Sequence, residues 1–355
     1  MLARTWGLFS GTRLSRAVGL VAAGAIAAGS FAETAAAQDA AAFYKGHKLT
    51  LGAPSNAGGG YDTYMRALSR HIGKHVPGEP TAIVQNVPAG GGMALANQLY
   101  NTSPKDGSYI GMIRGTVVQE HVYKNPQALF DGRKFVWLGN MNSDYDACIM
   151  WAASGVKTID DFYKREVIVG ASGAGAQSYS FPVVYRELLG MKFKVISGYP
   201  GTPERLLAME RGELTGACGI TTSTYRAVLS QPAKEGKVLL VAQAGSQKDP
   251  MYPDVPNILD QAKTPEIRQA LEFLFVPLGL GRPLAVAPGV PQDRVEILRK
   301  AVAETLHDPE FLEDAKKLKI DIEPMDAAAT AKMVGQLYDT PASVVGKLQA
   351  ALGSK

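Results

Sequence analysis

Short apolar runs alternate along most of the chain with longer stretches in which apolar residues recur at helical spacing. The runs at residues 48–53, 82–86, 109–113 and 167–170 each begin such a unit, and residues 294–306 have the apolar spacing of a helix near the C-terminus. Strand and helix in alternation predict an α/β fold, in which mostly parallel sheets are covered by helices on both faces.

Two glycine-rich turns, about thirty residues apart, each lie between a predicted strand and a predicted helix. Glycine leaves backbone N–H groups uncovered, and the N–H groups at the start of a helix bind anions. We therefore predict that the two turns form a cradle for a carboxylate. The predicted cradle consists of Ala57, Gly58, Gly59, Gly60, Tyr61 and Asp62 in the first turn and Ala89, Gly90 and Gly91 in the second. Asp62 either caps the helix that follows, the simpler role, or accepts a hydrogen bond from the ligand.

Further candidate contacts lie where other predicted strands end, because open α/β sheets bind ligands at that edge. Arg114 follows the third strand, where it either pairs with a carboxylate through two N–H groups or lies in solvent on the rim. After residues 167–170, a loop of small residues forms a second clamp. The remaining candidates are Thr116, the loop residues Ser172, Ala174, Gly175, Gln177, Ser178 and Tyr179, and, further along, Tyr199, Thr202 and Thr221. The loop lacks the G-K-[ST] ending of a phosphate-binding loop, which argues against a nucleotide.

Residues 1–37 have the features of a cleaved signal peptide. Arg4, Arg13 and Arg16 form a basic start, the uncharged run 17–29 is too short for a membrane span, and an A-x-A site follows at 35–37. The remaining 318 or so residues exceed what one hydrophobic core usually serves, so we expect two lobes. Without the leader the formal charge falls from +4 to about +2, and no basic stripe suggests nucleic acid.

The two cysteines and the histidines give little evidence of metal or catalytic chemistry. Buried thiols are our default interpretation of Cys148 and Cys218, with a disulfide, which an oxidising compartment permits, as the alternative. His71 and His75 are spaced i to i+4 but lack a third ligand, so we expect no metal and no cofactor. Asp144 and the alternate residue, Asp146, resemble an acid/base pair but are more simply a solvated pair.

The order of the motifs resembles the periplasmic solute-binding receptors of tripartite tricarboxylate transporters, the Bug or TctC-like family, over nearly the whole mature chain. Residues 54–62 are similar to the family's P-x-x-x-G-G-x-x-D, and residues 86–92 to its N-x-P-G-A-G-G. Further matches follow at 104–109, at 170–178, at 199–202 with Leu206, Leu207, Gly212 and Glu213, at 252–256, which is similar to L-P-D-V-P, and at 287–291. Each match is weak, whereas the ordered set is specific.

The resemblance implies a two-lobed (type II) periplasmic binding protein that closes on a carboxylate like a trap. The chain would cross the hinge twice, with residues 41–145 and 273–355 in lobe one and residues 146–272 in lobe two. In the family, backbone amides of the two glycine loops and ordered water hold the carboxylate. Expected partners are one large and one small membrane subunit, and the receptor is expected to be a monomer.

Two positions depart from the family pattern and affect the choice of ligand. Tyr61 stands where threonine or serine is common, and Gln177-Ser178-Tyr179 stands where the family often has T-S-H. The tyrosines are either ordinary wall residues or add an aromatic face, so an aromatic or short carboxylate is as compatible as a tricarboxylate.

Two other functional classes remain open from the sequence. A binding protein that presents its closed form to a membrane sensor has the same features as a transport receptor. A periplasmic enzyme acting on a small carboxylic acid is the third class, but the five histidines are scattered and none follows a G-x-S-x-G motif.

Overall fold

The computed structural model describes residues 41–58, 60–171, 176–199 and 202–353. The expected leader, residues 1–37, lies outside the described residues. So do four of the predicted site residues, which are Gly59, Ser172, Ala174 and Gly175. No helix in the described part of the chain is long and apolar enough to cross a membrane.

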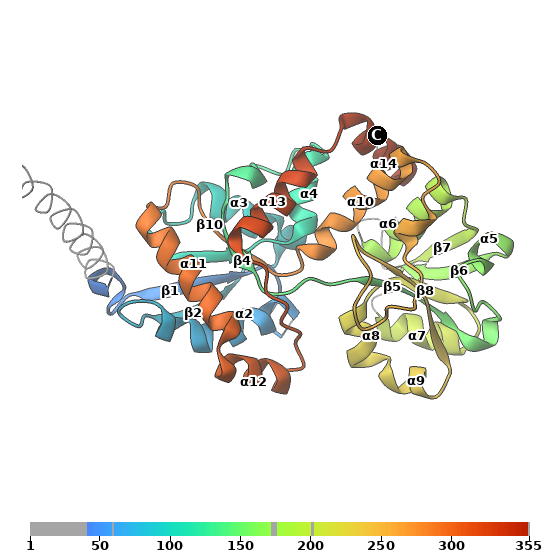
Figure 1. Ribbon diagram of the computed structural model, residues 1–355, viewed down its shortest axis with the longest axis horizontal. Coiled ribbons are helices and arrows are strands. Elements are labelled where there is room, and N and C mark those ends of the chain that lie inside the picture. The colour runs from blue at the N-terminus through green and yellow to red at the C-terminus, as the bar shows by residue number, and fades with distance from the viewer. Residues whose placement is uncertain (1–40, 59, 172–175, 200–201, 354–355) are drawn as a thin grey trace, which may run out of the picture.

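The described chain forms two lobes, each built on a five-stranded sheet (Figure 1). The first sheet consists, in spatial order, of β2 (Thr81–Asn86), β1 (Lys48–Ala53), β3 (Tyr109–Met112), β10 (Pro283–Val286) and β4 (Val136–Asn140). The second consists of β7 (Phe193–Ser197), β6 (Val167–Ala171), β8 (Gly216–Thr221), β5 (Asp146–Trp151) and β9 (Val238–Ala244). In each sheet one strand, β10 or β5, runs against the other four.

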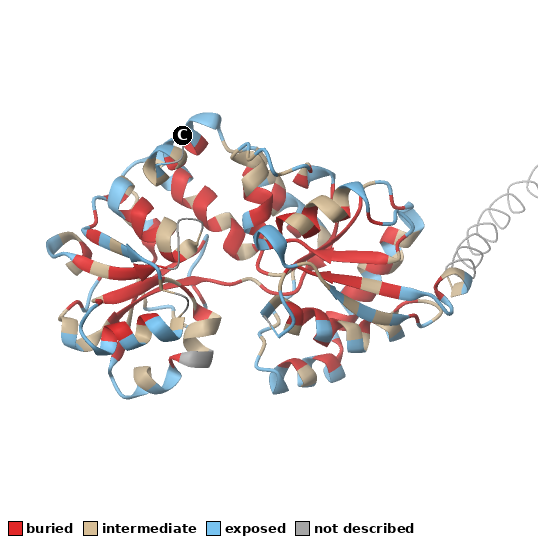
Figure 2. Ribbon diagram, turned by 180° about the vertical axis from the view of Figure 1, so that it is seen from behind, coloured by how far each residue is buried: buried red, intermediate tan, exposed pale blue. Residues whose placement is uncertain are grey.

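Helices cover both sheets, and the buried residues, red in Figure 2, lie mainly on the strands and on the inner faces of the helices. Those of the first lobe are α2 (Gly60–His71), α3 (Met93–Asn101), α4 (Gly115–Val122), α11 (Gln292–His307), α12 (Pro309–Lys317) and α13 (Ala327–Tyr338). Those of the second are α5 (Asp161–Lys164), α6 (Gln177–Val184), α7 (Thr202–Glu210), α8 (Thr222–Val228) and α9 (Ser230–Lys234). The two-lobed α/β architecture agrees with the sequence-based expectation.

Helix α10 (Pro265–Gly279) lies between the lobes and contributes to both (Figure 1). Thr264 caps its start by accepting the Ile267 N–H. Phe273 packs edge-on against Tyr123 beside α4 of lobe one, whereas Phe275 packs against Phe181 of α6 in lobe two, each with ring centroids 5.5 Å apart. The apolar core is therefore continuous from one lobe into the other.

Two stretches of chain cross between the lobes side by side, and their backbones are hydrogen bonded. The Asp144 N–H donates to the Leu278 carbonyl (3.0 Å), and the Met141 N–H donates to the Arg282 carbonyl (3.1 Å). The Asn140 amide joins the same two stretches, since Nδ2 donates to the Gly279 carbonyl and Oδ1 accepts the Arg282 N–H. Residues 140–144 and 278–282 thus form a paired hinge.

The C-terminal helix α14 (Ala342–Leu352) contacts both lobes. It packs against α6 of lobe two and against α10, and in Figure 1 it lies above the second lobe. Gln349 Nε2 also donates to the Tyr123 carbonyl of lobe one (3.1 Å). We had expected all of residues 273–355 in lobe one; we now propose that lobe one ends after α13 and that α14 belongs to lobe two.

Cys148 and Cys218 form a disulfide between the neighbouring strands β5 and β8. Both residues are buried, with exposed fractions of 2% and 0%. The interpretation as free thiols was therefore wrong. The reason lies in the topology, because the antiparallel insertion of β5 next to β8 brings together residues that are 70 positions apart in the sequence.

Candidate ligand-binding site

A cavity of about 310 Å³ lies between the lobes at the hinge. Its wall is formed by Tyr61, Arg114, Gly115, Thr116, Asp144, Ala176, Gln177, Ser178, Arg205, Gly219, Thr221, Pro277, Leu278, Leu280, Gly281 and Arg282. Lobe one, lobe two and both hinge stretches all contribute to this wall. The volume is within the range typical of small-molecule sites.

Arg114 reaches the cavity from the carboxyl edge of the first sheet, just before α4 begins. Its side chain passes over Gly92 (φ +106°), where an added Cβ would lie 3.2 Å from the arginine Cδ. The guanidinium lies 4.2 Å from the centre of the Tyr61 ring. It makes no hydrogen bond or ion pair with any described residue, and its Nε is buried. A half-buried cation without a carboxylate partner is unusual, because removing charge from water is costly unless it is paired.

Arg282 enters the same cavity from the hinge between α10 and β10. Its guanidinium carbon lies 4.3 Å from the Tyr61 ring centre and 4.7 Å from that of Tyr64. One terminal N–H donates to the Gly281 carbonyl (2.7 Å). Gly60, at the start of α2, lies next to this guanidinium, since a Cβ there would be 3.9 Å from it.

Arg205 is the third guanidinium, and it comes from α7 of lobe two. It is buried, with an exposed fraction of 5%, and donates to the Cys218 carbonyl (3.2 Å) and the Thr202 hydroxyl (2.9 Å). Burial lowers the pKa of Arg205 from its usual value, and the nearby Asp146 carboxyl acts in the opposite direction. The cavity therefore has arginines on both of its sides.

Asp144 and Asp146 are buried, with exposed fractions of 7% and 0%, so the expectation of a solvated pair was wrong. Asp144 accepts hydrogen bonds from the Ser223 hydroxyl (2.6 Å) and from the Tyr145 N–H (3.0 Å), and thereby helps to hold the start of α8. Asp146 accepts the N–H of Gly219 behind the cavity wall (3.0 Å). Burial raises the pKa of both carboxyls, that of Asp146 well above its ordinary value.

Solved structures with the same architecture are bacterial solute-binding proteins. A TctC solute-binding protein from Polaromonas, without ligand, superposes with a TM-score of 0.67 and 19% identity over 86% of this chain and 99% of its own. The periplasmic binding protein BugD superposes with a TM-score of 0.61 and 19% identity over 88% of this chain and 99% of its own. MatC from Rhodopseudomonas palustris, with bound malate, superposes with a TM-score of 0.59 and 20% identity over 84% of this chain and 99% of its own.

The fold is that of the TctC and Bug binding proteins. At these identities the likeness concerns the fold alone. No family model matches the chain, and no curated protein sequence matches it.

Six of the predicted site residues line the cavity of this TctC-like fold. They are Tyr61, Arg114, Thr116, Gln177, Ser178 and Thr221. Ten others are described but are not part of its wall: Ala57, Gly58, Gly60, Asp62, Ala89, Gly90, Gly91, Tyr179, Tyr199 and Thr202. Of these, Thr202 bonds to Arg205, whereas the residues of the two glycine turns, apart from Asp62, are exposed to solvent.

Asp62 has a structural role in the first glycine turn, but the contacts of its carboxylate are with the turn and with two side chains rather than with the free N–H groups of α2. Its carboxylate accepts hydrogen bonds from the Gly58 N–H, from Asn86 Nδ2 and from Arg66 Nε, each 2.8 Å long. Burial opposes ionisation, but the bonds from Arg66 and Asn86 outweigh it and keep the pKa of Asp62 below its usual value. The side chain is buried away from the cavity.

Sequence reasoning missed Arg205 and Arg282, the two arginines that join Arg114. Arg282 had a detectable signal, because it is the one charged residue in the otherwise apolar and glycine-rich run 273–292. Arg205 had none, since an arginine on an amphipathic helix is ordinarily exposed. The prediction named peptide N–H groups of the two glycine turns, whereas the described wall of the cavity carries three guanidinium groups.

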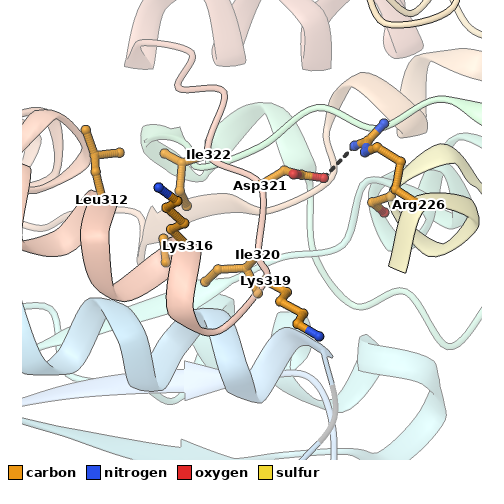
Figure 3. A pocket seen from close by; sticks show the side chains of 9 residues that line it. Arg226, Leu312, Lys316, Lys319, Ile320, Asp321 and Ile322 are labelled. Atoms are coloured by element: carbon orange, nitrogen blue, oxygen red, sulfur yellow. Dashed lines mark hydrogen bonds and ion pairs between the residues drawn. The ribbon is translucent and has the colours of Figure 1, made fainter. Parts of the chain in front are cut away.

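A second hollow, of about 470 Å³, lies at the rim between α12 and α8 (Figure 3). Its arginine, Arg226 of lobe two, forms an ion pair with Asp321 of lobe one (2.5 Å) and another with Asp249 (3.3 Å). The Tyr64 hydroxyl donates to the Asp321 carbonyl. Arg226 therefore serves as a tie between the lobes rather than as a free anion site.

The described residues include one group with metal-ligand spacing, formed by His71, Asp308 and Glu310 on the outer side of lobe one. Lys74 already forms ion pairs with both carboxylates of this group. His75 Nε2 lies 3.0 Å from Asp308, so the histidines also contribute to the contact between helices. The contacts present are those of an ion-pair cluster joining α2 to α12.

Proposed function

We propose that the protein is a periplasmic receptor that captures a small carboxylate-bearing solute between its two lobes. The observation that carries this proposal is Arg114, a guanidinium in the cavity between the lobes with no anionic partner among the described residues. Arg282 and Arg205 add two more cations, whereas Asp144 is the only carboxylate in the cavity wall as described. A site of this charge favours an anion, and guanidinium groups match the geometry of carboxylates.

Two further findings support the compartment and the ligand class. The disulfide between Cys148 and Cys218 suits an oxidising compartment such as the periplasm. MatC, which shares the fold, was solved with malate, a small dicarboxylate. We extend the proposal to delivery of the solute to the membrane subunits of a tripartite transporter, with the receptor acting as a monomer and not as an enzyme.

The experiment is a calorimetric titration of residues 38–355, freed of bound solute, with succinate, malate, adipate, citrate and benzoate. We expect at least one carboxylate to bind. Arg114→Gln should weaken that binding tenfold or more, because a hydrogen bond to a charged group contributes about 1.5–3 kcal/mol. Arg211→Gln, which makes the same change of charge at an exposed position of lobe two, should bind as the wild type does.

Two outcomes would contradict the proposal. If no carboxylate binds to the folded protein, the ligand class is wrong. If Arg114→Gln binds as tightly as Arg211→Gln, the solute is held elsewhere.

A further inference from the structure

Tyr61 carries two guanidinium groups on one ring. Arg114 lies 4.2 Å from the ring centre and Arg282 lies 4.3 Å from it. Tyr61 belongs to the first turn of α2, is half-buried and packs against the core of lobe one. It therefore forms a fixed platform at the cavity wall.

The Tyr61 ring helps to fix the positions of both guanidinium groups. Arg114 has no hydrogen bond or ion pair within the described residues, so the Tyr61 ring is its one specific polar contact there. Arg282 rests on Tyr61 and Tyr64, and in the described part of the chain its side chain makes one hydrogen bond, to the neighbouring Gly281 carbonyl. A guanidinium over an aromatic face is attracted by the ring and keeps its N–H edges free to bind an anion.

Two like charges held on one ring repel each other until an anion arrives. The single carboxylate in the described wall, Asp144, already accepts hydrogen bonds from Ser223 and Tyr145. Arg205 adds a third positive charge from the opposite lobe. The wall thus carries three guanidiniums and one carboxylate, and Asp146 lies behind it near Arg205. The two cations that share the Tyr61 ring offer one guanidinium to each carboxylate group of a solute that has two.

We propose that Tyr61 determines charge selectivity. By holding Arg114 and Arg282 in place on its ring, it makes the receptor prefer a solute with two carboxylates over a solute of the same length with one. This inference rests on the proposed function and adds a positioning residue to it. Tyr61 acts through the two arginines, so it is the ring rather than the hydroxyl that matters.

The test compares matched acids by calorimetry, namely succinate with butyrate and adipate with hexanoate. Tyr61→Leu keeps apolar bulk but removes the aromatic face, and Tyr61→Thr removes both. In each variant we expect the affinity for the dicarboxylate to fall tenfold or more and that for the monocarboxylate less than threefold, so that selectivity is lost. The conservative variant Tyr61→Phe should rescue the wild-type ratio to within about twofold.

The control is Tyr163→Thr, which removes another half-buried tyrosine that has a cation over its ring, Lys263 at 5.6 Å, on lobe two. It should leave the ratio unchanged. Melting temperatures identify any variant that fails to fold, and Tyr61→Leu then remains as the test. A second readout is the salt dependence of dicarboxylate binding, which should become weaker when the two cations are no longer held together.

The outcomes separate this inference from the proposed function. If the wild type binds both acids of a pair equally, or if Tyr61→Leu keeps the wild-type ratio, the role of Tyr61 is refuted while the carboxylate receptor stands. If Tyr61→Phe loses as much as Tyr61→Leu, the hydroxyl is responsible and the stacking argument is refuted. If the wild type binds no carboxylate at all, the proposed function itself fails.

Discussion

Replacing both cysteines with alanine, Cys148→Ala with Cys218→Ala, removes the cross-link between β5 and β8 of lobe two. The cross-link joins residues 70 positions apart. A loop of this length closed by a disulfide reduces the entropy of the unfolded chain by an amount equivalent to about 4.4 kcal/mol. For a chain of this size that unfolds as one unit, the loss corresponds to a fall in melting temperature of about 6 °C.

Urea unfolding followed by tryptophan fluorescence can assign the loss to a lobe. Residues 38–355 contain one tryptophan in each lobe, Trp137 in β4 and Trp151 in β5. With Trp137→Phe as background, the signal reports lobe two, and with Trp151→Phe it reports lobe one. The double cysteine variant should lower the midpoint of the lobe-two signal at least as much as that of the lobe-one signal.

Wild-type protein treated with reductant is the matched control, because it opens the same loop without removing any atoms from the core. Both samples should lose a similar free energy of unfolding. A loss below about 1 kcal/mol in the non-reduced double variant would refute the entropic estimate. Since the Cys218 carbonyl accepts a hydrogen bond from Arg205, we also expect weaker solute binding by the reduced protein.

Two more predictions concern lobe two. Burial raises the pKa of Asp146, so its stabilising contribution is complete below the unfolded-state pKa of about 3.9 and is lost as pH rises through the folded-state pKa. Relative to Asp146→Asn, the wild type should lose about 1.4 kcal/mol of unfolding free energy for each unit by which the pKa is raised. Urea titrations from pH 4 upward measure this loss. Gly219→Ala places a Cβ 2.3 Å from the Ser178 Cα at φ +71°, and it should destabilise the fold by about 2–5 kcal/mol and weaken solute binding. Gly212→Ala, at φ +75° with open space around it, is the control that measures the cost of the backbone angle alone. Equal losses of stability in the two variants would contradict the role of the close contact.

The parts of the site that could be predicted from the sequence are those encoded by neighbouring residues. A short apolar run followed by a polar residue marks the carboxyl end of a strand, and this is how Arg114 was placed at the edge of the sheet. The stretch after β6 was proposed in the same way, and two of its residues, Gln177 and Ser178 at the start of α6, line the cavity. Such signals extend over a few residues and do not depend on the partner strand.

The remaining parts depend on contacts between distant segments. The burial of Asp146, the first residue of β5, follows from the insertion of that strand between β8 and β9, which no local pattern indicates. The same insertion places Cys148 next to Cys218. Arg205 is buried because the start of α7 packs near the end of β8, as its bond to the Cys218 carbonyl records. Topology determined these features, and the sequence alone left the topology open.

If the protein is the receptor that we propose, the position of Arg282 links solute binding to movement of the lobes. Its backbone N–H is bound to the Asn140 side chain and its carbonyl accepts the Met141 N–H, so both stretches of the hinge meet at this residue. Its side chain, however, lies in the cavity on Tyr61. An anion that binds this guanidinium therefore exerts its attraction at the hinge itself. A solute can shift the lobes only by the difference in its affinity for their two arrangements, and a contact at the hinge that also reaches Arg205 of lobe two supplies such a difference.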